Sequence, residues 1–178
     1  MFTKDNTYKV LRIFFDYPEK KFHIRETARL TKLSPAGVIK IIDKLKKEGF
    51  LISEKEKMVE NVSATRNERF VMFKRFYNIA ALFDSGLIDF LKEKYEEPET
   101  IILFGNYSRG EDISTNDIDI AVITKKSLQL DVVKYEKILK RKIDIFEFKA
   151  PKKEYLNSLA NGIVLFGHLK IIENQKIK

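Results

Sequence analysis

The sequence contains no cysteine and only two histidines, His23 and His168, in 178 residues. The lack of cysteine excludes disulfides, thiolate zinc sites and cysteine nucleophiles. With so few histidines, any bound metal ion must be held by oxygen ligands, which favours Mg²⁺ or Mn²⁺. Long apolar segments are missing too, since stretches such as residues 10–15 are far shorter than the roughly 20 residues that span a bilayer.

The N-terminus, MFTKDNTYK, is polar and has no apolar signal-peptide core. We therefore expect a cytoplasmic protein with no membrane partner. The chain does contain enough apolar material to fold, with 44% hydrophobic residues and 14 Phe. Its length suits one ordinary domain or two small ones.

Positive charge is concentrated near the N-terminus. The whole chain has a net charge of +8, and residues 1–57 contain 14 Lys and Arg against 8 Asp and Glu. Such an excess indicates an anionic partner such as nucleic acid. A Lys- and Glu-rich solvated surface, common in thermophile proteins, explains the same composition, so charge alone does not identify the partner.

The first 73 residues predict three helices followed by two strands. Helical patterns cover residues 9–16 and 25–32, and a third helix begins after Ser34, a good N-cap, with Pro35 at its first position. We expect residues 50–58 and 59–73 to form strands around a polar turn. The third helix would end at Gly49, and its buried face would be Val38, Ile41, Ile42 and Leu45, spaced i, i+3, i+4, i+7.

This order resembles a winged helix-turn-helix domain, and the stretch LSPAGVIKIIDKLKKEGFL carries most of the likeness. In that fold the third helix enters the DNA major groove. Lysines suit phosphate contacts better than base recognition. Winged helices also serve as dimerisation or protein-binding modules, so a homodimer is an alternative use of this domain. The resemblance implies DNA contacts from Lys40, Lys44 and Lys47 on the helix and from Lys55, Lys57, Arg66 and Arg69 on the wing.

Residues 74–97 are expected to form a helical linker that turns at Gly86, and Pro98 marks the likeliest boundary to a second domain. We therefore predict an α+β protein with a winged helix-turn-helix domain at residues 1–73, a linker at 74–97 and a small α/β domain with a mixed sheet at 98–178. Within the last domain we expect strands at 100–104, 117–124 and 142–148, a tight turn at 105–110, and helices at 128–140 and 154–160.

Three aspartates in this second domain are candidates for metal ligands. Asp117 and Asp119 share one face of a strand, because alternate residues of a strand point the same way, and such a pair suits two divalent ions. An Asp-x-Asp pattern on its own more often indicates an exposed strand face with two solvated acids than a metal site. Asp144, in KIDIFEF, has apolar neighbours on its own face and is costly to bury unless it is paired or bound to metal. Parallel strands would gather all three carboxylates at one end of the sheet, with Glu147 on the opposite face.

The turn GNYSRG contains two glycines that allow the backbone to approach a phosphate closely. Its spacing matches a P-loop only superficially, because Glu111 and Asp112 follow where a P-loop has Lys and Ser or Thr. Without that lysine, metal ions would have to neutralise a triphosphate, and the three aspartates allow this. A plain strand-to-helix glycine loop is the alternative.

Together these motifs resemble the nucleotidyltransferase superfamily that includes DNA polymerase β, and more closely the minimal nucleotidyltransferases of archaeal type. The family signature is Gly-Ser, a later Gly, an Asp-x-Asp and a third Asp on a neighbouring strand. The likeness covers about residues 99–170, and the signature falls here on Gly105, Asn106, Gly110, Asp117, Asp119 and Asp144.

The resemblance implies two Mg²⁺ (or Mn²⁺) ions at Asp117, Asp119 and Asp144, with Asp144 able to help take a proton. Binding of the NTP phosphates would fall to Gly105, Asn106 and Gly110, with Arg109 either helping or lying on the solvated surface.

The implied activity is transfer of NMP from an NTP, with ATP the first choice, to a hydroxyl of a protein, RNA or small molecule. The rival interpretation is a DNA-binding transcriptional regulator whose nucleotidyltransferase-like domain only senses nucleotide or mediates assembly. The three intact aspartates favour the enzyme. Asn106, which stands where the family has Ser, and the DNA-binding-like domain favour the regulator.

Overall fold

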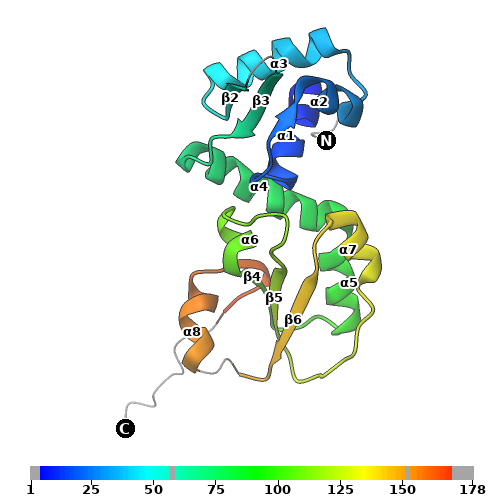
Figure 1. Ribbon diagram of the computed structural model, residues 1–178. Coiled ribbons are helices and arrows are strands. Elements are labelled where there is room, and N and C mark those ends of the chain that lie inside the picture. The colour runs from blue at the N-terminus through cyan, green and yellow to red at the C-terminus, as the bar shows by residue number, and fades with distance from the viewer. Residues whose placement is uncertain (1–4, 57–58, 151–152, 170–178) are drawn as a thin grey trace. The chain divides into compact units, whose positions relative to one another are not determined.

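The computed structural model describes residues 5–56, 59–150 and 153–169 (Figure 1). The chain divides into two compact units, Met1–Lys74 and Arg75–Lys178, and the described strands form one sheet in each. None of the helices in the described ranges is long and apolar enough to cross a membrane.

The first unit packs three helices against a three-stranded antiparallel sheet in the order β1-β3-β2. The third helix begins as predicted, since the Ser34 side chain accepts a hydrogen bond from the backbone N–H of Gly37 and Pro35 occupies the first turn. Val38, Ile42 and Leu45 are buried, whereas Ile41 is only half-buried. The elements are α1 (Asn6–Asp16), β1 (Phe22–His23), α2 (Ile24–Thr31), α3 (Pro35–Lys47), β2 (Leu51–Glu56) and β3 (Val59–Ala64).

The strand predicted for residues 59–73 is wrong beyond Ala64, because a helix, α4 (Glu68–Ser85), begins there. The side chain of Asn67 accepts a hydrogen bond from the backbone N–H of Phe70 at 2.9 Å, which caps the first turn of that helix. Arg69 therefore lies on α4 and not on a wing, with its guanidinium 5.2 Å from the ring centre of Phe50. The short strand β1 was not expected from the sequence.

The second unit contains a mixed four-stranded sheet in the order β6-β5-β4-β7. Strand β4 is antiparallel to both β5 and β7, whereas β5 and β6 are parallel. The α+β class and the mixed sheet predicted from the sequence are confirmed. The elements after α4 are α5 (Leu87–Lys94), β4 (Thr100–Phe104), α6 (Gly105–Arg109), β5 (Ile118–Ile123), α7 (Val133–Leu139), β6 (Ile143–Phe148), α8 (Lys153–Ala160) and β7 (Ile163–Gly167).

Both faces of this sheet are covered, as expected for strands that are apolar on both sides. One face packs Leu103, Ile120 and Val122 against residues 82–95, which include the apolar side chains of α5. The other face packs Phe104 and neighbouring strand residues against α8. The segment that the sequence treats as a linker thus contributes side chains to the core of the second unit.

Two local predictions for the second unit need correction. Residues 105–109 form a one-turn helix in place of a tight turn, and Gly110 ends it in a left-handed conformation with φ of 74°. The helix predicted for residues 128–140 is restricted to α7, because the backbone N–H of Leu128 donates to Glu147 at 2.8 Å. That bond holds the chain beside the sheet, so the helix starts only after Asp131, whose side chain accepts from the N–H of Val133.

Candidate active site

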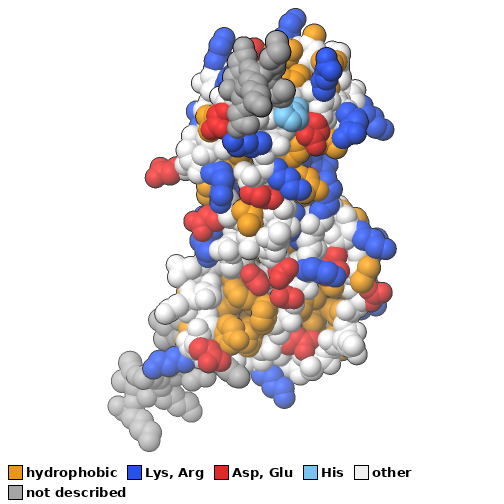
Figure 2. All heavy atoms as spheres, viewed as in Figure 1, with side chains coloured by type: hydrophobic (Ala, Val, Ile, Leu, Met, Phe, Trp, Pro, Cys, Tyr) orange, Lys and Arg blue, Asp and Glu red, His pale blue; other side chains and the backbone are white. Residues whose placement is uncertain are grey.

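The strand register brings Asp119 and Asp144 side by side. On the parallel strands β5 and β6, Asp119 is the register partner of Asp144, and on the antiparallel side it pairs with Phe104, the last residue of β4. Asp117 immediately precedes β5. On the face drawn in Figure 2, acidic side chains gather over the end of the sheet where β5 and β6 begin. The three predicted carboxylates therefore lie at one end of one sheet.

The three carboxylates affect one another electrostatically. Burial raises the pKa of Asp119, and the negative charges of Asp144 and then of Asp117 raise it further. Asp117 and Asp144 are exposed, whereas Asp119 is half-buried. A cation among these groups would relieve the repulsion that raises the pKa of Asp119.

The donor chemistry of this cluster fits a hard divalent cation, because Mg²⁺ prefers carboxylate oxygens. Within the described ranges, however, no group of three or more His, Cys, Asp or Glu side chains is arranged to hold a metal ion as it stands. The register and the shared electrostatics, rather than a closed ligand cage, are what this structure shows.

Gly105 lies directly against the carboxylate of Asp119. Its φ is 71°, and a Cβ atom placed on it would be 2.1 Å from Oδ2 of Asp119. No other residue fits such a contact without moving the carboxylate. The hydroxyl of Ser108 donates to the carbonyl oxygen of Gly105 at 2.8 Å, which closes the single turn of α6. The glycine segment and the Asp-x-Asp segment, read as separate motifs in the sequence, are thus in direct contact.

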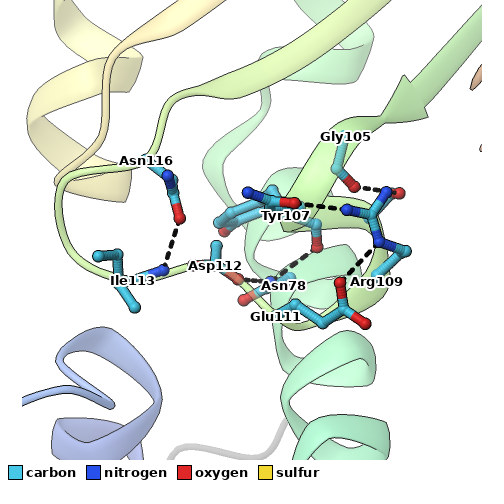
Figure 3. A network of polar contacts seen from close by, with 10 residues as sticks. Asn78, Gly105, Tyr107, Arg109, Glu111, Asp112, Ile113 and Asn116 are labelled. Atoms are coloured by element: carbon cyan, nitrogen blue, oxygen red, sulfur yellow. Dashed lines mark hydrogen bonds and ion pairs between the residues drawn. The ribbon is translucent and has the colours of Figure 1, made fainter.

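The exposed side of α6 carries a short chain of polar contacts (Figure 3). Nε of Arg109 donates to Glu111 Oε2 at 2.7 Å, and Nη2 of Arg109 donates to Oδ1 of Asn106. Both Asn106 and Arg109 are exposed. The guanidinium therefore orients the Asn106 amide through its oxygen, and the amide nitrogen is turned away from the positive charge. Arg109, expected either at the phosphates or on the surface, is in contact with one of the predicted phosphate-binding residues.

Glu147 lies on the opposite face of β6 from Asp144, as the alternation predicted. It accepts hydrogen bonds from the hydroxyl of Tyr95 at 2.6 Å, from Ser127 Oγ at 2.7 Å and from the N–H of Leu128 at 2.8 Å. Desolvation opposes ionisation, but these bonds together keep the pKa of Glu147 below its ordinary value. Glu147 thus has a structural role away from the aspartate cluster.

Asp117 also borders an open pocket of about 610 Å³. One wall is the loop of residues 114–117 and the other is α7 with the residues that follow it. Lys137, Lys140 and Lys142 contribute to its lining. The aspartate cluster therefore contacts α6 through Asp119 and borders this pocket through Asp117.

Of the residues predicted to contact DNA, three are brought together by the structure. Lys40, Lys44 and Lys47 are exposed on α3, on the side away from its buried residues. Arg66 is exposed in the connection after β3, at φ of 53°. Lys57 lies outside the described residues, and for Lys55 only the backbone, in β2, is described.

A protein-family model matches a range within the second unit. The family described as "Polymerase beta, Nucleotidyltransferase" matches residues 86–170. A Methanocaldococcus jannaschii protein named "Putative protein adenylyltransferase MJ1379" is 38% identical over 73 residues, which is 37% of this chain and 72% of that protein. The chain belongs to this nucleotidyltransferase family. The matched range contains the glycine segment and all three aspartates, so the family and the geometry concern the same residues.

A mutant of Lactococcus lactis ZitR is 20% identical with a TM-score of 0.39, and the match covers 49% of this chain and 60% of that one. A second ZitR mutant, in apo form, is 21% identical with a TM-score of 0.40 over 53% of this chain and 72% of that one. Likeness at this level supports no inference about the nucleotidyltransferase.

Sequence reasoning missed three buried polar residues near the cluster, Asn78, Asp112 and Arg141. From the sequence, Asp112 was noted only because it stands where a P-loop would have Ser or Thr. Asp112 and Arg141 are charged residues beside the functional motifs, and charged residues are so common on surfaces that burial could not be inferred. Asn78, on α4, lies far from both motifs in the sequence and gave no signal.

Proposed function

We propose that this chain is a divalent-metal-dependent nucleotidyltransferase that moves NMP from an NTP, with ATP the first choice, to a hydroxyl acceptor. The observation that supports the proposal most strongly is the position of Asp119 on the central strand β5. It lies beside Gly105, which follows β4, and opposite Asp144 on β6. Phosphoryl transfer depends mainly on positioning and on neutralising charge. A contact between a glycine-led turn and a carboxylate cluster suits both requirements.

The aspartates would hold two Mg²⁺ or Mn²⁺ ions, and Asn106, Arg109, Gly110 and the backbone of Gly105 would hold the phosphates. When bound, such ions neutralise phosphate charge and lower the pKa of an acceptor hydroxyl. Arg109 contacts Asn106, which supports the proposal that the guanidinium and the amide would bind the same phosphate group. Burial, and then the charges of Asp144 and Asp117, raise the pKa of Asp119, so a cation beside it would favour its ionised form.

In the reaction, the acceptor hydroxyl oxygen forms a bond to the α-phosphorus of the NTP. The bond from that phosphorus to the bridging oxygen of the β-phosphate breaks, and pyrophosphate leaves with the electron pair. The hydroxyl proton passes to the carboxylate of Asp144, which is exposed and therefore accessible to an acceptor. The pocket bordered by Asp117 offers the acceptor a place next to the aspartates. The name of the M. jannaschii relative supports a protein hydroxyl as acceptor.

The first unit favours a second activity, DNA binding through a winged helix-turn-helix domain. The specific observation is the row of exposed lysines on α3, Lys40, Lys44 and Lys47. Regularly spaced lysines suit contacts with phosphates along a backbone. The alternative to the enzyme is a DNA-binding regulator whose second unit senses nucleotide or mediates assembly, including a homodimer.

One experiment separates the two. The full chain is incubated with NTPs radiolabelled at the α-phosphate, Mg²⁺ and cell extract, beside an Asp117→Asn/Asp119→Asn double variant. We expect labelled product with the wild type and none with the variant. A wild type that transfers no label, while both proteins bind DNA tightly in a salt-sensitive manner, contradicts the enzyme and supports the regulator.

A further inference from the structure

A buried network joins four segments of the second unit, namely α4, α6 and the loops before β5 and β6 (Figure 3). Nδ2 of Asn78, on α4, donates to the carbonyl oxygen of Tyr107 at 2.9 Å and to Oδ1 of Asp112 at 2.8 Å. Oδ2 of Asp112 lies 3.5 Å from Nη2 of Arg141, and the side chains are 0% and 4% exposed. The network thus connects α6, the loop before β5 and the loop before β6.

The members of this network lie close in sequence to the proposed catalytic groups. Tyr107 follows Gly105 in the single turn of α6. Asp112 precedes Asp117 in the loop that enters β5, and Arg141 precedes Asp144 at the entry to β6. Each of the three segments that carry the proposed active site is therefore attached to the same buried cluster.

The chain between the network and the aspartates is short and held by its own bonds. In the loop before β5, Oδ1 of Asn116 accepts from the N–H of Ile113 at 2.9 Å. At the sheet, the N–H of Ile118 donates to the carbonyl oxygen of Lys142 at 2.8 Å. A shift of Asp112 or Arg141 is therefore transmitted to the carboxylates and not absorbed by slack in the loops.

Stability alone does not account for such a pair. Removing two charges from water costs free energy that their attraction often fails to recover, and apolar replacements of both partners are frequently neutral or stabilising. In some proteins, buried polar or ionic groups serve to hold segments in one arrangement. This pair joins the entries to the two strands whose register sets the distance between Asp119 and Asp144.

We infer that Asn78, Asp112 and Arg141 are positioning residues, which set the separation between the aspartates of β5, Asp144 on β6, and α6. The inference rests on the proposed function, because it assigns the network to that same site. None of the three needs to touch metal or nucleotide. Arg141 also borders the pocket proposed for the acceptor, so metal affinity, and not transfer alone, is the readout that tests the network. Loss of the network would loosen the carboxylate cluster and weaken its hold on divalent cations while the fold remains.

The decisive variant is Asp112→Asn/Arg141→Met, which removes both buried charges together and keeps an amide oxygen for Asn78. Arg141→Met alone leaves the Asp112 charge buried and is expected to melt at lower temperature. The matched control is Lys126→Met, which breaks the surface ion pair of Lys126 with Glu96, 2.6 Å long, and likewise replaces a cation by methionine. All proteins are full-length.

The unfolding temperature without metal measures the stability of the fold. Titration with Mn²⁺, followed by electron paramagnetic resonance, measures the affinity of the aspartate cluster for the ion. We expect the double variant to unfold near the wild-type temperature but to bind Mn²⁺ about 10- to 100-fold more weakly, the usual effect of losing supporting groups. Its kcat should fall at limiting Mn²⁺ and recover at high Mn²⁺. The Lys126→Met control should match the wild type in both measurements.

A folded double variant with wild-type Mn²⁺ affinity overturns the inference. If the wild type binds Mn²⁺ but transfers no nucleotide, the proposed function fails while the affinity comparison still tests the network. If the wild type binds no Mn²⁺, the inference and the proposed function are both overturned.

Discussion

Replacement of Gly105 by alanine would place a methyl group on the carboxylate of Asp119. The added Cβ would lie 2.1 Å from Oδ2 and 3.1 Å from Cγ of that side chain. Ordinary contact needs a separation more than about 1 Å longer, so the carboxylate or the turn must move by that amount. The φ of 71° at Gly105 adds backbone strain of about 1–2 kcal/mol for an L-residue.

Gly86 provides a matched control for the strain. Its φ is 79°, and the described part of the chain places no atom within 4 Å of a Cβ built there. Gly86→Ala therefore carries the same kind of backbone strain without displacing a functional group. We expect Gly86→Ala to lower the free energy of unfolding by about 1–2 kcal/mol. Gly105→Ala should lower it by at least as much, because the contact with Asp119 adds to the backbone strain.

Only Gly105→Ala should impair the site. A displacement of about 1 Å in a catalytic group can reduce the rate by about 100-fold, so we expect a loss of that order in label transfer and weaker Mn²⁺ binding. The assays are urea unfolding, transfer from α-phosphate-labelled NTP and Mn²⁺ titration, each with both variants. The reasoning is refuted if Gly105→Ala transfers label and binds Mn²⁺ as well as Gly86→Ala does.

Three further predictions follow from charges in the two units. Because the pKa of Asp119 is raised above its ordinary value, its ionised form destabilises the fold, and wild-type stability should fall as pH rises between the ordinary and the raised pKa. Asp119→Asn should remove this loss of stability, raise the metal-free unfolding temperature near neutral pH and abolish transfer. Melting at several pH values and the label assay measure these effects, and a variant less stable than the wild type would contradict the expectation. Glu147→Gln should lower the free energy of unfolding by about 1–3 kcal/mol and leave kcat unchanged, because Glu147 faces away from Asp144. Because the pKa of Glu147 is lowered in the folded state, the wild type gains stability above the ordinary pKa and loses it as pH falls through the lowered pKa. Replacing Lys40, Lys44 and Lys47 together by Glu should eliminate salt-sensitive DNA binding in a gel-shift titration and leave transfer intact, and unchanged binding would contradict the proposed DNA surface.

Predictions from the sequence were correct for features that depend on a single helix or strand. The N-cap at Ser34 and the buried face of α3 followed from short-range chemistry, and so did the faces of β6, with Glu147 opposite Asp144. Prediction failed at the start of the helix expected for residues 128–140, where the bond from the N–H of Leu128 to the distant Glu147 competed with helix formation. The strand expected beyond Ala64 was wrong for a local reason, because Asn67 caps a helix there.

Chemistry and alternation were determined by the sequence alone. A chain without cysteine and with two histidines leaves oxygen as the main metal ligand, and the period of two along a strand places Asp117 with Asp119, and Asp144 with Phe146. These properties depend only on residue types and on neighbours in the chain.

Which carboxylates meet was decided only by the tertiary structure. The parallel register sets Asp119 opposite Asp144, and slipping one strand by a single residue would turn its side chains to the other face. The contact of Gly105 with Asp119 and the burial of Asp112 with Arg141 likewise depend on segments far apart in the chain. Such contacts form only when packing of the whole unit sets the strand register, so no local sequence pattern predicts them.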